Sequence, residues 1–555
     1  MNPFASTKCA GRLLMALPAI ASILLLAACG SSSSAPTPNS VGFSNSNLKG
    51  TYVLSISGTD FHPSSGTGSL FAFVGTIMAD GNGNIEGGKT TVDINDLNLG
   101  GTGVFLAQPV GASTYSITPD GRGTAKLSTA EGNFGLDFVL TSNGHGLITR
   151  FDSFGSGSGT LDLQASASQG SLGSLAFSLA GVDYNLSSAG NPLPPFGTVG
   201  AFTPNTSTGA ITSGTQDFND NGSSTVSGST GLQLTGGSLV LASSGTSGTA
   251  VLTTSSIFGS LAFDVWVIDS THLKLIETDT NTSGYALSGD AFTQQTSFTG
   301  GQLVYTISGV DSTLANPVAA GGYATTDAQG NLSNLLEDYN DASAINTLQG
   351  LSGSCLTFVA GRCQLNLPTF SNGTAQDFQF AAYPSSGGVQ LLEIDGHGLM
   401  QGAAYAQTEP SFAAPAGYGL NLSGENTNGE VDDIAQFNTN TATTNNVVGV
   451  LNENDLTSPC PNPIGGCYSL LGTYTTPVSG RGSITALVPG SLIGGLTLEY
   501  YVVDGSTMLF IEGDTNQVAV GTFQAQSTTG SAGVAQSHMA IVHPAVRAHG
   551  ALPSK

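Results

Sequence analysis

The sequence predicts an all-β protein built as a tandem array of antiparallel meander units. Four stretches of the chain close with a glycine and, five residues later, a glutamine: Gly159 and Gln164, Gly289 and Gln294, Gly402 and Gln407, Gly521 and Gln526. Apolar residues alternate with small or polar ones near the start of each stretch, which indicates half-buried strands. Glycine-rich turns separate such segments, as antiparallel hairpins require. Each unit is therefore expected to be an up-and-down barrel or, alternatively, a β-sandwich.

Each unit is expected to open with a strand whose apolar residues lie two apart and that ends at a glycine. The four sets are Tyr52, Leu54 and Ile56 before Gly58; Leu175, Phe177 and Leu179 before Gly181; Leu303, Tyr305 and Ile307 before Gly309; and Tyr418, Leu420 and Leu422 before Gly424. In the fourth unit another turn glycine, Gly429, follows closely, whereas the matching glycines of the other units lie much farther on. This difference predicts that the fourth unit has lost a strand and that its sheet is open or borrows an edge.

The N-terminus predicts export and lipidation. Lys8 and Arg12 precede an apolar run that ends in Leu26-Ala27-Ala28-Cys29. This order resembles a bacterial lipoprotein signal peptide with its lipobox. The resemblance implies cleavage before Cys29, diacylation of its thiol and tethering to the membrane. Gly30 follows the cysteine and allows an outer-membrane or cell-surface location.

The expected organisation divides the chain into seven parts. They are a signal peptide (1–28), a flexible tether (29–46), β-units at 47–164, 165–295, 296–408 and 409–526, of which the last is shortened, and a disordered tail (527–555). No substantial helix is expected after the signal peptide, because no later segment has a helical period.

Charge and cysteine usage narrow the class of protein. The net charge is -25, and only 9% of the residues are charged. Such a surface repels phosphates and anionic headgroups, which argues against nucleic-acid binding and suits neutral or basic partners. Two close cysteine pairs, Cys355 with Cys363 and Cys460 with Cys467, are expected to form disulfides in an oxidising compartment. A metal site is the alternative for these thiols.

Four strings of the first unit are similar to the repeats of exported lipoproteins that are abundant in acidobacteria. They are Gly50-Thr51-Tyr52, the turn Asp80-Gly81-Asn82-Gly83-Asn84, Gly87-Gly88 with Asp93 and Asn95 after it, and Asp120-Gly121-Arg122-Gly123. The resemblance covers the first unit well and the other units loosely. Because those proteins are uncharacterised, it implies an envelope location and adds no activity.

One acidic pattern, here called the Asx motif, recurs in three units. Its members are Asp93, Asn95 and Asp96; Asp217, Asn219 and Asp220; and Asp338, Asn340 and Asp341, with a degraded fourth copy at Gln436-Phe437-Asn438-Thr439. Carboxylate and amide oxygens at this density are typical calcium ligands. The alternative is that the Asp and Asn side chains end a strand and cap the next turn. No cofactor other than calcium is predicted.

A second pattern, here called the acidic pair, places glutamate and aspartate two residues apart. The pairs are Glu277 and Asp279, Glu393 and Asp395, and Glu512 and Asp514; the first unit has Arg150 and Asp152 instead. Spacing of two puts both carboxyls on one face of a strand, continuing an apolar face to the point where the core meets water. That position suits a raised pKa and glycosidase-like chemistry. Because the pair recurs, a structural or ligand-binding role is the favoured interpretation.

The sequence therefore predicts a lipid-anchored envelope protein whose units form a non-catalytic binding, adhesion or spacer module. Expected partners are the membrane, through the N-terminal lipid, and a glycan or surface protein. Repetition would turn weak binding by each unit into avidity. The alternative is a surface polysaccharide hydrolase that uses one acidic pair.

Overall fold

The computed structural model describes residues 41–61, 68–99, 103–183, 194–220, 230–255, 259–279, 285–311, 316–342, 345–371, 374–414, 416–426, 429–440, 445–455, 466–491 and 494–528. Strands dominate, with three short 3-10 helices, η1 (Asn45–Asn47), η2 (Leu97–Leu99) and η3 (Gln169–Ser171). The all-β prediction is confirmed. No helix in the described ranges is long and apolar enough to cross a membrane. The signal peptide, Cys29, Cys460 and most of the tail lie outside these ranges.

Unit 1 is a ten-stranded sheet. Its strands are β1 (Lys49–Phe61), β2 (Gly68–Asp80), β3 (Asn84–Ile85), β4 (Thr91–Asp96), β5 (Val104–Pro109), β6 (Ser113–Ile117), β7 (Arg122–Ser128), β8 (Asn133–Ser142), β9 (His145–Phe151) and β10 (Gly155–Leu163). β1 pairs with both β2 and β10, and β2 pairs with both β3 and β4. β6 pairs with β3, and β5 pairs with β4. The third and fourth strands of the meander are therefore each interrupted once.

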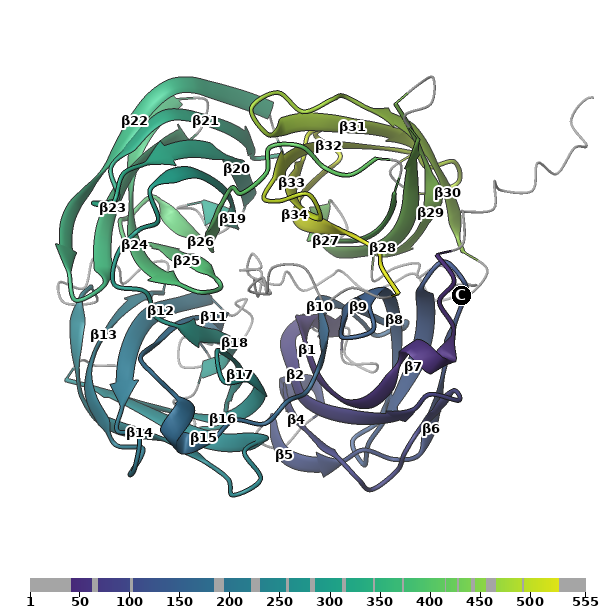
Figure 1. The fold of residues 1–555 in the computed structure, drawn as a ribbon, viewed down its shortest axis with the longest axis horizontal. Helices are drawn as coiled ribbons and strands as arrows, with labels where there is room; N and C mark the ends of the chain where they lie inside the picture. The colour runs from purple at the N-terminus through teal and green to yellow at the C-terminus, as the bar shows by residue number, and fades with distance from the viewer. Residues whose placement is uncertain are drawn as a thin grey trace, which may run out of the picture. The chain divides into compact units, whose positions relative to one another are not determined.

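Units 2, 3 and 4 are closed barrels in which every strand pairs antiparallel with its neighbours (Figure 1). Unit 2 contains β11 (Leu175–Asp183), β12 (Pro195–Pro204), β13 (Ile211–Asn219), β14 (Leu232–Leu241), β15 (Ser247–Thr254), β16 (Ser260–Asp269), β17 (His272–Glu277) and β18 (Tyr285–Thr293). Unit 3 contains β19 (Gly301–Asp311), β20 (Pro317–Thr326), β21 (Leu332–Asn340), β22 (Ile345–Val359), β23 (Arg362–Ser371), β24 (Thr374–Ser385), β25 (Gly388–Glu393) and β26 (Gly398–Ala406). Unit 4 contains β27 (Gly417–Asn426), β28 (Gly429–Asn440), β29 (Asn446–Asn454), β30 (Tyr468–Tyr474), β31 (Arg481–Leu487), β32 (Gly495–Val502), β33 (Thr507–Glu512) and β34 (Gln517–Ala525). Of the two architectures expected, the structure has the barrel.

The expectation that unit 4 has lost a strand is wrong, because β27 to β34 close a complete barrel. Gly429 begins the second strand of this unit, whereas Gly209 and Gly330 lie in the turn after the second strand. Only residues 427 and 428 separate β27 from β28, whereas residues 184–194 separate β11 from β12. Unit 4 is therefore shorter in a connection between strands, and its sheet is intact.

The interior of each unit is filled by its own apolar cluster, and the segment before the first strand packs against that cluster. Phe43, Leu172 and Phe298 are buried in the cores of units 1, 2 and 3. Phe412 packs against the core of unit 4, where its ring contacts Tyr418, among others. A cavity of about 20 Å³ inside unit 3 has room for a single water molecule at most. These interiors are cores that stabilise the units.

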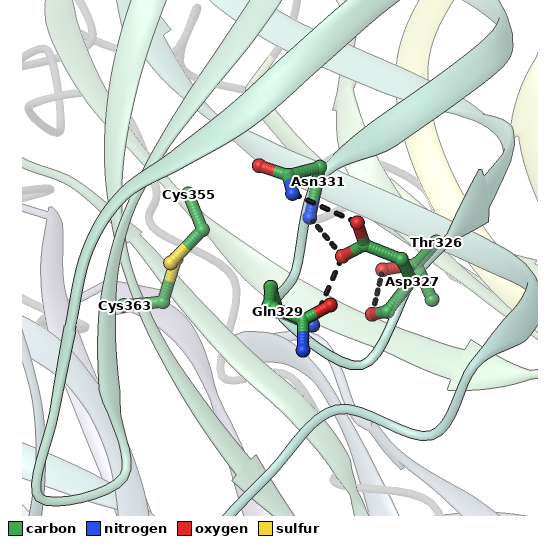
Figure 2. The surroundings of a disulfide bond; sticks show 6 residues. All are labelled: Thr326, Asp327, Gln329, Asn331, Cys355 and Cys363. Atoms are coloured by element: carbon green, nitrogen blue, oxygen red, sulfur yellow. Dashed lines mark hydrogen bonds between the residues drawn. A yellow bond between two sulfur atoms is a disulfide. The ribbon is translucent and has the colours of Figure 1, made fainter.

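The predicted glycine-rich turn before β21 is present and is centred on Asp327. Asp327 accepts the backbone N–H groups of Gln329 and Asn331, at 2.9 Å each, and the Asn331 amide at 2.8 Å. Figure 2 shows this turn near the disulfide between Cys355 and Cys363, a pairing that confirms one of the two predicted bridges. Cys467 is also disulfide-bonded.

Candidate functional site: the junctions between units

Consecutive units contact each other, and both acidic motifs lie at these contacts, which we call junctions and number by their units. β2 lies against β17 and β18 at junction 1–2, β12 against β24 and β25 at junction 2–3, and β20 against β33 and β34 at junction 3–4. β28 lies against β8, β9 and β10, which makes junction 4–1 (Figure 1). The junctions therefore form a closed cycle.

The asparagine of each Asx motif binds the backbone at the acidic pair of the next unit. The Asn219 amide donates to the carbonyl oxygens of Glu393 and Gly398 at 2.8 and 3.0 Å. Asn340 donates in the same way to Glu512, at 2.9 Å. Asn95 donates to the Glu277 carbonyl at 3.4 Å. The two sequence motifs are thus the two sides of one contact.

The fourth copy of this contact closes the cycle. The Asn454 amide donates to the carbonyl oxygens of Arg150 and Gly155 at 3.1 and 2.9 Å. The fourth Asx motif is therefore Asn452-Glu453-Asn454-Asp455, and its assignment to Gln436-Phe437-Asn438-Thr439 was wrong. Residues 436–439 lie on β28, the second strand, whereas the motifs of units 2 and 3 end the third strands β13 and β21. In unit 1, Arg150 and Asp152 occupy the positions of the acidic pair, and the Arg150 carbonyl is an acceptor at this junction.

The first aspartate of the motif binds an arginine and a tyrosine of the next unit at two junctions. Asp217 accepts the Arg362 guanidinium at 2.7 and 2.5 Å and the Tyr383 hydroxyl at 2.5 Å. Asp338 accepts Arg481 at 2.6 and 2.9 Å and Tyr501 at 2.6 Å. Bidentate guanidinium pairs of this kind are among the stronger charge-assisted contacts. The sequence signal for these aspartate–arginine contacts is the dipeptide Gly-Arg, which occurs as Gly361-Arg362 and Gly480-Arg481.

Junction 1–2 has no arginine at the equivalent aspartate in the described part of the chain. The indole N–H of Trp266 donates to Asp93 at 3.2 Å. Burial, together with the Asp264 carboxylate, raises the pKa of Asp93 to about 7. The only tryptophan of the chain is therefore a junction residue.

A buried network of charges also lies at junction 1–2. Asp290 binds His272 at 2.6 Å and Lys274 at 2.7 Å. In unit 1, Asp162 binds His145 at 2.6 Å. Burial alone would raise the pKa of Asp162, but His145 and then Lys274 hold it well below its usual range. Sequence reasoning missed this network because its members lie on different strands and share no motif.

The predicted calcium ligands do not converge on one place. Asp93, Asp217 and Asp338 belong to three junctions, and the amides of their motifs bind backbone carbonyls. The last residues of the motifs are Asp96, Asp220 and Asp341; Asp96 accepts the backbone N–H of Asn98 at 2.8 Å, as the turn-capping alternative requires. Within the described ranges, no group of three or more His, Cys, Asp or Glu side chains could hold a metal ion. Calcium binding stays a prediction.

The glutamates of the acidic pairs are fully buried, contrary to the expectation that they lie where the core meets water. Glu277, Glu393 and Glu512 each have an exposed fraction of 0%. Burial, followed by the charge of Asp279, raises the pKa of Glu277 to about 9. The same causes raise the pKa values of Glu393 and Glu512 well above the usual range. The direction of the pKa shift is thus the expected one, and burial favours the neutral form of each glutamate.

Each member of an acidic pair accepts backbone hydrogen bonds inside its own unit. Glu393 accepts the N–H of Met400 at 3.0 Å, and Asp395 accepts the N–H of Gln379 at 2.6 Å. Asp279 accepts the N–H of Ala262 at 3.0 Å. Asp514 accepts the N–H of Asn516 at 2.9 Å. Through these hydrogen bonds the acidic pairs stabilise the hairpin ends whose backbone carbonyls the preceding unit binds.

The glutamine that closes each unit binds the following one. The side-chain amide of Gln164 donates to Thr246 and Val267, that of Gln294 to Ala360, that of Gln407 to Val502, and that of Gln526 to Asp120 and Leu140, always at carbonyl oxygens. Gly480 has a φ of +86°, and a Cβ there would lie 2.1 Å from the Gln407 amide nitrogen. Gly480 therefore has two roles: it adopts the positive φ of the turn, and its lack of a side chain leaves room for the Gln407 amide.

Comparison with known proteins adds little to this geometry. No known family matches the chain, and no curated protein matches it. Among solved structures it is similar to a mutant of transferrin-binding protein B from Haemophilus parasuis Hp5, with 9% identity and a TM-score of 0.19 over 70% of this chain and 83% of that chain. Isotype 1 transferrin-binding protein B from serogroup B Neisseria meningitidis gives 12% identity and a TM-score of 0.20 over 69% and 84%. Scores at this level carry no argument about function.

Proposed function

We propose that this chain is a lipid-anchored envelope protein whose four barrel units act as a non-catalytic binding, adhesion or spacer module. The anchor is Cys29, as the resemblance to a lipobox implies. Junctions that form a closed cycle hold the units in fixed relation, which lets several weak contacts act together.

The observation that carries this proposal is the burial of the glutamate of each acidic pair. A glycosidase needs two carboxyls that flank the scissile bond and reach the substrate. Glu277, Glu393 and Glu512 are inaccessible, and the carbonyl of each is bound by the preceding unit. These groups stabilise the array, so the hydrolase alternative loses the residues on which it rested.

Ligand contact is expected on the strands that face away from the junctions. Most residues of β14, β22 and β30 are exposed or partly buried, whereas the strands that meet at junctions, such as β17 and β25, are almost entirely buried. The net charge of -25 favours a neutral or basic partner.

A substitution at Glu393 separates the two functions. Glutamine resembles the protonated glutamate, so Glu393→Gln should leave the melting temperature close to that of the wild type, and Glu393→Ala should lower it. A hydrolase that uses this pair would instead lose its activity in Glu393→Gln. Polysaccharide hydrolysis by the wild type that Glu393→Gln, Glu277→Gln or Glu512→Gln abolishes singly would overturn the proposal.

Binding and anchoring need separate measurements. A thermal-shift screen of the mature chain without its lipid should use calcium, a chelator and a glycan panel; a shift identifies the ligand class, and no shift in any condition leaves the spacer role. Mass spectrometry of the mature N-terminus should find acylated Cys29, and Cys29→Ala should release the protein from the membrane. A wild-type chain that fractionates as unmodified and soluble would refute the anchor.

A further inference from the structure

Junction 4–1 differs from its counterparts in how carboxyls are buried across it. Asp432 and Glu430 lie two residues apart on β28 and face unit 1, with exposed fractions of 0% and 3%. Asp432 accepts the hydroxyls of Ser156 and Ser158 at 2.7 and 2.6 Å. Glu430 lies against Gly58, because a Cβ on that glycine would be 2.6 Å from the Glu430 carboxyl oxygen. An acid pair is thus enclosed on the second strand of unit 4, where the matching positions of unit 3 are Ala319 and Pro317.

Among the described residues, the groups that act on this pair include hydroxyls and further carboxyls. β10 contributes Ser156 and Ser158, β1 contributes Thr59, and β27 contributes Ser423 and the charged Glu425. On the other face of β28, Asp433 is opposite Glu453 of β29, and Asp455 lies nearby. Like charges opposite each other destabilise a pair of strands.

A second buried carboxyl spans the same junction. Asp137 of β8 accepts the Asn452 amide at 3.0 Å and has an exposed fraction of 2%. Arg122 is the cation that acts on it. Val139, Leu147 and Ile434 supply the small apolar contact beside these groups.

We propose that junction 4–1 is a pH-sensitive closure of the cycle, held while its buried carboxyls keep their protons and released when they ionise. Unlike the other three junctions, it joins units that are not consecutive in the chain. Once it opens, no linker holds units 4 and 1 together. Opening would expose to solvent the surface of unit 4 around Asn454 and the surface of unit 1 around Arg150, which bind each other in the closed state.

The sign of the pH dependence follows from the titrations. Burial, and then the Asp432 charge, raises the pKa of Glu430 well above its usual range. Burial also raises the pKa of Asp432, and that of Asp137 to about 7. Groups whose pKa is raised by folding stabilise the closed state fully below their unfolded pKa, and this stabilisation is lost as the pH rises through the folded pKa. The closure is therefore expected to hold in mild acid and to release above neutrality.

Small-angle X-ray scattering of the full mature chain tests the proposal at about pH 6 and about pH 9. The radius of gyration should rise reversibly with pH. In the double variant Glu430→Gln and Asp432→Asn, which copies the protonated state, the rise should disappear and the acid value should persist. Absence of a rise in the wild type, a rise that persists in the double variant, or a double variant that is expanded at both pH values would each overturn the proposal.

Two further variants locate the opening. A Cβ on Gly419 would lie 2.9 Å from Cγ1 of Val139, so Gly419→Cys with Val139→Cys should form a disulfide across junction 4–1. The cross-linked chain should show no rise. Asp338→Asn at junction 3–4 should keep the rise, since its partner is an arginine. A cross-linked chain that still expands would show that another junction opens and would refute the assignment.

Discussion

Junctions 3–4 and 1–2 differ in chemistry at one matching position, the third residue of the seventh strand of the later unit. At junction 3–4 Leu509 of β33 is opposite Thr522, and Leu509 is buried among apolar side chains. At junction 1–2 the equivalent position of β17 is Lys274, opposite Asp290. Both junctions keep the asparagine and glutamine contacts to backbone carbonyls. The backbone contacts therefore define how units meet, and the side chains between them can vary from apolar to ionic.

The largest effect is expected where the arginine-bound junction is broken. Asp338→Ala removes the acceptor of the Tyr501 hydroxyl and the bidentate partner of Arg481, which keeps only its contact with Glu499 at 2.9 Å, and it should lower the free energy of unfolding by about 3–5 kcal/mol in urea denaturation. Glu86→Ala, at an exposed position, should change it by less than about 0.5 kcal/mol. A loss at Asp338 no larger than this control would show that the arginine contact does not stabilise junction 3–4.

Transplanting the apolar pair sharpens the comparison. Lys274→Leu alone leaves Asp290 buried with a lost cation and should cost about 3–5 kcal/mol. Asp290 also binds His272, so the matching replacement is the triple variant His272→Thr, Lys274→Leu and Asp290→Thr, which copies Thr507, Leu509 and Thr522. It should be neutral or stabilising by about 1–4 kcal/mol. Urea denaturation of the single and the triple variant checks this. A triple variant less stable than the single one would mean that the ionic network is specific to junction 1–2.

Asp93 of junction 1–2 and Asp338 of junction 3–4 should also differ in how their contribution to stability depends on pH. Asp93 has a pKa raised to about 7, so its contribution is present below its unfolded pKa and is lost as the pH rises through about 7. Asp93→Asn should therefore match the wild type at about pH 5 and exceed its melting temperature at about pH 8.5. Asp338→Asn should lower the melting temperature at both. Equal profiles for the two variants would remove this distinction.

The smallest effect is expected at the closing glutamines, which both junctions share. Gln407→Ala removes one hydrogen bond to Val502, of 2.7 Å, and should cost about 1 kcal/mol. Gln164→Ala removes two hydrogen bonds, to Thr246 and Val267 at 3.0 Å each, and should cost about 2 kcal/mol at junction 1–2. Gln329→Ala at an exposed turn should cost almost nothing. A loss at Gln164 no larger than the loss at Gln407 would show that the shared contacts depend on what fills the junction.

The sequence predicted the local structure well because local structure depends on short periods and turn residues. The alternating sets such as Tyr418, Leu420 and Leu422, the Asp327 turn and the Cys355–Cys363 bridge are all present. The role of the acids could not be predicted in the same way. Whether Glu393 faces water depends on the barrel end around it and on Asn219 of another unit, and no spacing within the chain specifies that.

The misplaced fourth motif has the same cause. Gln436-Phe437-Asn438-Thr439 resembles the Asx motif in composition, but only strand order distinguishes β28 from β29. Asn454 fits because it ends the third strand, β29, and identifying the third strand requires the strands of the barrel to be counted correctly. The repeat was therefore visible in the sequence, whereas its alignment required the pairing of strands.

The ends of the described chain meet at a single turn of unit 1. The N–H of Gly42 donates to the Pro119 carbonyl at 3.0 Å, and the Gln526 amide donates to the neighbouring Asp120 carbonyl at 2.8 Å. The order of units along the chain is thus one of several that would give each unit the same neighbours. A circularly permuted gene that starts at unit 2 and ends with unit 1 would encode the same set of junctions, with the break in the chain moved to another one.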